Sequence, residues 1–133
     1  MFHIAQGVTD PITNAADWND YLPATNTQPA GIRIDVDTSN CGFTSTPQYL
    51  ISIEGVLGYH WYLSGQNSIY NATPTGFTVY LRWTDAPSDF PTIGVTNEPN
   101  SLRVATAVAK RWSMKWTGIS TCPCSAASPK QGK

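Results

Sequence analysis

The strongest constraint on the fold is a regular alternation of apolar and polar residues in three segments. In residues 31–37, isoleucine and valine alternate with arginine and aspartate. In residues 77–84, large apolar side chains alternate with Thr, Tyr and Arg, and residues 112–119 repeat the pattern with tryptophan and methionine. A period of two places successive side chains on opposite faces of a strand, so each segment predicts a strand with one buried face.

The chain between these segments predicts further short strands joined by turns. Glycine, proline and asparagine, the residues that favour turns, separate the apolar stretches. An additional strand is predicted over residues 47–54, a strand or strand-like loop over 59–63, and a short strand over 68–72. About six such strands predict an all-β fold, an antiparallel six-stranded β-sandwich over residues 31–120.

The remaining segments predict less regular structure. Residues 1–30 contain three prolines and predict an extended, irregular N-terminal segment, in which only residues 14–21, with Asn14 as the helix N-cap, favour a short helix. Residues 86–100 predict a long loop, and residues 101–109 predict one short helix before the last strand. Residues 121–133 are rich in Ser, Pro and Lys and predict a loose C-terminal tail.

Charge and composition argue against several classes of partner. The chain has 8 basic and 9 acidic residues, and the basic ones are scattered, so no nucleic-acid partner is expected. No apolar run approaches the roughly 20 residues of a membrane span. Charged residues make up only 13% of the chain, while it has five Trp and six Tyr. This composition is typical of surfaces that contact sugars or other proteins.

The three cysteines predict no metal site, because neither histidine stands at a recognised ligand spacing from them. A disulfide between Cys41 and either Cys122 or Cys124 would link an early strand to the tail. The alternative is that all three thiols are reduced in a cytosolic protein.

No pattern in the chain predicts catalysis. The sequence has no nucleophile motif and no Gly-rich phosphate loop. Asp35 with Asp37, and Asp85 with Asp89, are paired carboxylates of the kind that glycosidases use, but solvated strand residues explain them more simply. The chain is therefore not expected to be an enzyme, and no cofactor is predicted.

Several segments, taken in order, carry a family resemblance. They are the stretch Phe43–Pro47 leading into a strand, the turn and strand Asn71–Val79, the triplet Trp83–Asp85 and the closing strand Trp112–Ile119. This order resembles the H-type lectin domain of snail agglutinins and of the C-terminal part of slime-mould discoidins. The chain departs from the family at residues 86–111, where the family has a short loop, and near Ser64, where it often has an arginine.

The resemblance implies a carbohydrate-binding function. Family members are six-stranded antiparallel sandwiches that form trimers and bind N-acetylgalactosamine-type sugars at clefts between subunits. A glycan partner, a homo-oligomer with a trimer favoured, and an extracellular or surface location are therefore expected, with a cytoplasmic location as the alternative. The sequence Asn71-Ala72-Thr73 is a glycosylation sequon, relevant if the protein is secreted by a eukaryote.

The residues expected to bind the sugar are Trp83, Asp85, His60, Trp61 and Arg82. Trp83 and Asp85 match the family's binding loop, and a tryptophan face with a carboxylate suits a sugar ring and its hydroxyls. His60 and Trp61 belong to the densest aromatic cluster, and Arg82 could bind a ligand or a neighbouring chain. Packing in the core is the alternative for the aromatic residues, a turn for Asp85 and solvation for Arg82.

A second functional hypothesis is a structural module without a sugar ligand. The long N-terminal segment and tail, the segment 86–111 and the low charge also suit a chain that packs against neighbours in a surface layer, filament or capsid-like particle.

Overall fold

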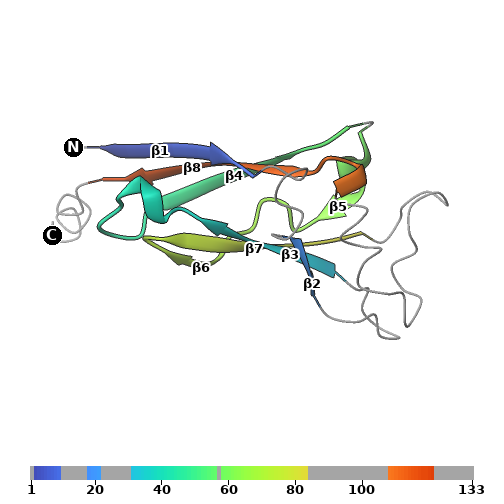
Figure 1. The fold of residues 1–133 in the computed structure, drawn as a ribbon, viewed down its shortest axis with the longest axis horizontal. Helices are drawn as coiled ribbons and strands as arrows, with labels where there is room; N and C mark the ends of the chain where they lie inside the picture. The colour runs from blue at the N-terminus through green and yellow to red at the C-terminus, as the bar shows by residue number, and fades with distance from the viewer. Residues whose placement is uncertain (1, 10–17, 22–30, 57, 84–107, 122–133) are drawn as a thin grey trace, which may run out of the picture.

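Two antiparallel sheets make up the part of the chain that the computed structural model describes, which is residues 2–9, 18–21, 31–56, 58–83 and 108–121 (Figure 1). This architecture confirms the predicted all-β class. No helix among these residues has the length and apolar character needed to cross a membrane.

The smaller sheet has three strands in the order β1-β8-β4, all antiparallel. Its members are β1 (His3–Val8), β8 (Ser113–Ser120) and β4 (Gln48–Glu54). The two strands predicted over residues 112–119 and 47–54 correspond to β8 and β4. In β8 the side chains of Met114 and Trp116 are buried while Lys115 between them is exposed, as the period of two requires.

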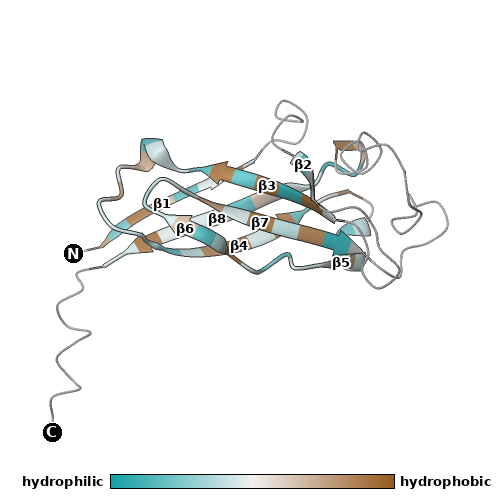
Figure 2. Cartoon of the chain, turned by 90° about the horizontal axis from the view of Figure 1, so that it is seen from below, coloured by the Kyte–Doolittle hydropathy of each residue, from teal (hydrophilic) through white to brown (hydrophobic). Residues whose placement is uncertain are grey.

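The larger sheet has the order β2-β3-β7-β5, with β6 also paired to β7. Its members are β2 (Trp18–Tyr21), β3 (Gly31–Asp37), β7 (Gly76–Trp83), β5 (Leu63–Ser64) and β6 (Tyr70–Thr73). Hydropathy alternates visibly along β3 and β7 (Figure 2). Both strands bury their aliphatic side chains. Those of Ile32 and Ile34 in β3 and of Val79 in β7 have no exposed surface.

The prediction that residues 1–30 are irregular was wrong in part, because they contribute β1 to the smaller sheet and β2 to the larger one. The structure therefore describes eight strands, two more than the six predicted. In β1 the inward positions are Ala5 and Gly7, and a Cβ at Gly7 would lie 2.8 Å from the Trp116 indole. Small residues are therefore needed there, and they hide the alternation. The predicted helix over 14–21 was also wrong at its end, because residues 18–21 form β2 along β3.

Two further predicted elements differ in detail. The aromatic stretch is not a strand, because Tyr59–Tyr62 forms the 3-10 helix η3 and only Leu63 enters β5. Of the short helix predicted over 101–109, the structure describes residues 108–109, which are helical, and the rest lies outside the described residues, as does the loop 86–100.

Aromatic side chains from both sheets meet in the core. The Tyr49 ring of β4 lies 4.5 Å from that of Phe77 in β7, and Phe77 lies 6.3 Å from Trp116 in β8, centroid to centroid. The two sheets therefore pack face to face through these rings.

The hydroxyl of Tyr49 joins the sheets through two hydrogen bonds. It lies 2.8 Å from Thr38 Oγ1, which is buried, and donates to the Thr73 carbonyl at 2.8 Å. Tyr49→Phe is expected to lower the free energy of unfolding by about 1–3 kcal/mol, because both partners lose a hydrogen bond. Chemical denaturation measures the change. An unaltered midpoint would show that water replaces the hydroxyl.

Candidate functional site

The helix η3 brings part of the predicted site to one end of the larger sheet. It begins after Gly58, which has a φ of 71°, and the Trp61 N–H donates to the Gly58 carbonyl at 3.0 Å. The chain then enters β5, where Leu63 pairs with Trp83 and Ser64 pairs with Arg82. The pairing therefore places η3 directly beside the C-terminal end of β7.

A groove of about 610 Å³ lies between η3 and β4, where the edges of the two sheets face each other. Three residues of β4, two of η3 and two of the turn after β5 line it, together with the glycine before η3. These residues are Ile51, Ser52, Ile53, Gly58, His60, Trp61, Gln66 and Asn67. The volume is in the range of small-molecule sites.

Trp61 dominates the rim of this groove. Its side chain is 85% exposed, although tryptophan is among the residues with the most apolar area to bury. The other aromatic residues of η3 pack against protein: the rings of Tyr59 and Tyr62 lie 6.4 Å apart, and the Lys110 ammonium lies 3.5 Å from the centre of the Tyr59 ring. Trp61 thus presents an uncovered indole face on a helix that its neighbours hold in place.

Two polar atoms in the groove have no hydrogen-bond partner among the described residues. They are His60 Nδ1 and Gln66 Oε1, and both are shielded from solvent although the two residues are only partly buried. A buried polar atom without a partner costs about 1–3 kcal/mol. Because solvent does not reach either atom in this structure, a ligand hydroxyl would pair with them only after the two side chains rotate toward the groove.

The turn that carries Gln66 is held close to β7 by Gly65. This residue has a φ of 88°, and a Cβ at this position would collide with the Tyr80 carbonyl oxygen. The Ser68 N–H donates to the Gly65 carbonyl at 3.2 Å and closes the turn. Only glycine combines this φ with so close an approach, so the position of Gln66 depends on it.

The structure brings together only part of the predicted sugar site. His60 and Trp61 line the groove. Arg82 is exposed and does not line the groove. For Trp83 the structure describes only the backbone, which pairs with Leu63 of β5. Asp85 lies outside the described residues. The roles of Arg82, Trp83 and Asp85 in sugar binding stay predictions.

The cysteine and glycosylation sites both stay predictions. Cys41 is a free thiol in this structure, and its predicted disulfide is not tested because neither proposed partner cysteine is described. The residue ends the 3-10 helix η2 (Ser39–Cys41) and packs, half-buried, against the core as a small apolar side chain. The other two cysteines lie outside the described residues. Asn71 is exposed, and its sequon stays a prediction.

Gln66 and Asn67 were missed as site residues by sequence reasoning. The sequence predicts only a turn over residues 64–67, and the place of Gln66 and Asn67 in the groove depends on the close contact of that turn with β7. The available signal was their position next to the aromatic stretch 59–63, between two predicted strands.

Neither a metal site nor a similarity to a known protein helps to assign a function to this groove. Within the described ranges, no three His, Cys, Asp or Glu side chains are grouped so that they could hold a metal ion. No protein-family model, curated protein or solved structure matches the chain significantly. The chemistry of the groove must therefore be argued from its own side chains.

Proposed function

We propose that this chain is a carbohydrate-binding domain that takes a sugar ring into the groove between η3 and β4. The observation that carries the proposal is the exposed indole of Trp61 in a groove that is also lined by the polar side chains of Ser52, His60, Gln66 and Asn67. A sugar ring has an apolar face that packs on an aromatic ring and hydroxyl groups around its edge that pair with polar atoms.

The composition of the groove favours a sugar over a purely apolar ligand. Ile51 and Ile53 supply an apolar floor, while Ser52, Gln66 and Asn67 supply groups that donate and accept hydrogen bonds. None of the lining residues is Asp, Glu, Lys or Arg, so a neutral ligand fits best. The resemblance to H-type lectins adds an expectation of N-acetylgalactosamine- or galactose-type sugars and of an oligomer, which would raise avidity.

A titration with single sugars tests the proposal. N-acetylgalactosamine, galactose, glucose and mannose are added in turn while tryptophan fluorescence and amide NMR shifts are followed. We expect a saturable change at His60, Trp61 and Gln66 with at least one sugar. No response to these sugars or to a broad glycan array would contradict the function.

Gln66→Leu is expected to weaken the binding of that sugar by up to about tenfold, because it removes one hydrogen-bond acceptor and preserves the side-chain size. Isothermal titration measures the dissociation constant. Gln48→Leu is the matched control, because Gln48 is an exposed glutamine on β4 that does not line the groove. Equal affinities of the two variants would remove Gln66 from the site.

A structural module of an assembly is the second candidate. The outer face of the smaller sheet exposes three aliphatic side chains, Ile4 at 60%, Val8 at 58% and Leu50 at 52%. An apolar face of this kind suits burial against neighbouring chains. Light scattering distinguishes the candidates, because an assembly module forms open-ended polymers or requires partner chains, whereas a lectin forms closed particles.

A further inference from the structure

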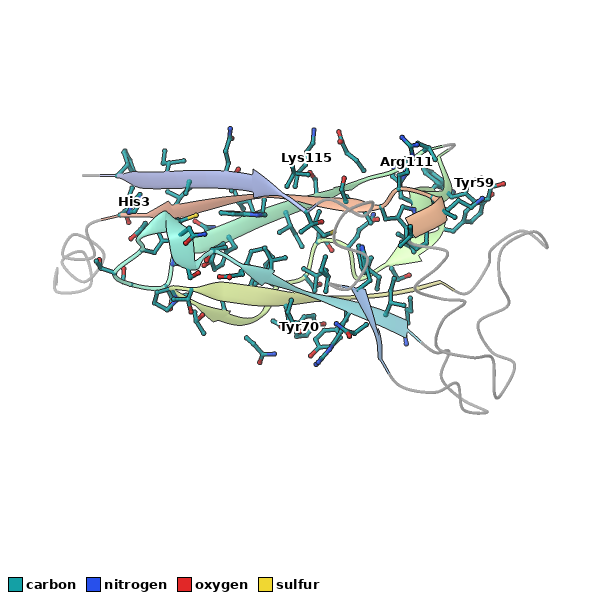
Figure 3. The ribbon with its side chains drawn as sticks, viewed as in Figure 1. His3, Tyr59, Tyr70, Arg111 and Lys115 are labelled. Carbon is teal, nitrogen blue, oxygen red and sulfur yellow. The ribbon has the colours of Figure 1, made fainter. Side chains whose placement is uncertain are left out.

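The outer face of the larger sheet carries a second group of aromatic and charged side chains, away from the groove. Tyr80 lies opposite Arg33 on β3, and Thr78 lies between Asp35 on β3 and Tyr70 on β6. The rings of Tyr70 and Tyr80 pack edge to face at 4.8 Å. Tyr70 points away from the smaller sheet (Figure 3) and is 46% exposed. We call this surface, defined by Arg33, Asp35, Asp37, Tyr70, Tyr80 and Arg82, the tyrosine face.

The charges of the tyrosine face are ordered along the strands. Arg82 pairs with Gly31 at one end of the β3–β7 ladder, and Asp37 pairs with Gly76 at the other end. The six residue-to-residue steps from one end to the other span about 20 Å. Arg33 lies next to Arg82, one step nearer the centre of the ladder, and Asp35 lies next to Asp37, also nearer the centre. One half of the face is therefore basic and the other half is acidic.

These charges are only weakly compensated within the chain. The Arg33 guanidinium lies 3.7 Å from the Asp35 carboxylate, and both side chains are well exposed, at 41% and 55%. Among the described residues no ion pair involves Arg82 or Asp37. Hydrogen bonds from the Ser39 side chain and backbone lower the pKa of Asp37, which is therefore ionised at neutral pH.

We propose that the tyrosine face binds the same face of a second copy of this chain, around a two-fold axis that lies in the interface and runs across the strands. Such an axis reverses the strand direction between the copies and keeps β3 opposite β3. Arg33 then faces Asp35 of the partner subunit, and Arg82 approaches the partner's Asp37. The tyrosines of both copies lie at the centre, where aromatic residues contribute most to an interface.

The arrangement of charges selects this axis over the other face-to-face choice. A two-fold axis parallel to the strands would place basic halves together and acidic halves together, which is repulsive. The selected contact is isologous and uses the whole tyrosine face of each copy, so it closes as a dimer and does not continue into a fibre.

The dimer has a consequence for ligand binding, which rests on the proposed function. The two-fold axis runs across the sheet from the β2 edge to the β5 edge. The rotation therefore keeps the β5 edges of the two copies on the same side of the dimer. Both grooves lie at that edge, between β4 and the segment around β5. Two sugar sites on one side would engage a glycan-covered surface together and raise the avidity.

Charge complementation between variants tests the dimer. Arg33→Glu with Arg82→Glu makes the face wholly acidic, and Asp35→Lys with Asp37→Lys makes it wholly basic. Analytical ultracentrifugation of each variant alone at low ionic strength should give half the mass of the wild-type particle. An equimolar mixture should restore the wild-type mass, and added salt should reduce it again. Lys115→Glu, a charge reversal on the other sheet, is the control and should leave the mass unchanged.

Three results would overturn the proposal: a wild-type chain that is monomeric at its highest soluble concentration, variants that retain the wild-type mass, or a mixture that does not reassemble. Circular dichroism verifies that each variant is folded. If the lysine variant does not fold, because Asp35 loses its 2.6 Å bond from Thr78, the mass of the glutamate variant alone decides. Monosaccharide affinity should not change in the folded lysine variant or in Arg33→Glu alone, both of which keep Arg82, so this proposal and the proposed function fail independently.

Discussion

Trp112→Ala is expected to lower the free energy of unfolding by about 3–5 kcal/mol. The Trp112 side chain is completely buried immediately before β8, where a Cβ at Gly55 would lie 2.6 Å from its ring. The indole therefore fills the space between these two segments, and alanine would leave a cavity that the backbone pairing of β8 with β4 prevents from collapsing. Equilibrium denaturation in urea, followed by circular dichroism, measures the loss.

The same substitution at Trp61 is the matched control for stability. Trp61 is 85% exposed, so Trp61→Ala is expected to change the free energy of unfolding by less than about 0.5 kcal/mol. A comparable loss of stability in the two variants would mean that the indole of Trp61 is packed against protein. A loss of less than about 1 kcal/mol for Trp112→Ala would contradict its place in the core.

Trp61→Ala is expected to weaken sugar binding by at least about tenfold, which corresponds to about 1.4 kcal/mol. The physical reason is that the alanine variant lacks the flat apolar surface on which the sugar ring would pack, while the polar atoms of the groove remain. Isothermal titration with the sugar that gives a response in the wild type measures the dissociation constant.

The control for Trp61→Ala is Phe2→Ala, because Phe2 is another exposed aromatic residue, at 70%, and does not line the groove. It should bind the sugar like the wild type. If Trp61→Ala retains wild-type affinity while the wild type does bind a sugar, the binding site lies elsewhere, and residues 83–85, which carry the lectin resemblance, become the next positions to substitute.

Four strands were predictable because each has one buried and one exposed face. In β3 and β7 the positions that face the core are β-branched or large apolar residues, and the positions that face outward carry Arg, Asp, Tyr or Thr. β4 and β8 follow the same rule with Tyr49, Met114 and Trp116 inside. The period of two is a local property, so it is visible without knowledge of which strands pair.

The two N-terminal strands were not predictable, because their signal depends on other parts of the chain. β1 turns Ala5 and Gly7 inward, and Trp116 occupies the space that larger side chains would need. β2 is four residues long and exists as a strand because it pairs with β3. An asparagine at a helix-cap position outweighs such weak local signals when the sequence is considered alone.

The sequence by itself determined that this chain is an all-β protein, since strand alternation is encoded residue by residue. It also marked two candidate places for a site, residues 83–85 and the aromatic stretch 59–63. Only the tertiary structure decided which tryptophan is core and which is surface, because Trp112 and Trp61 have the same chemistry and differ in what packs against them. It also decided that Gln66 joins His60 and Trp61, since the contact of a glycine turn with β7 creates the groove, and such contacts between distant segments leave no periodic trace in a sequence.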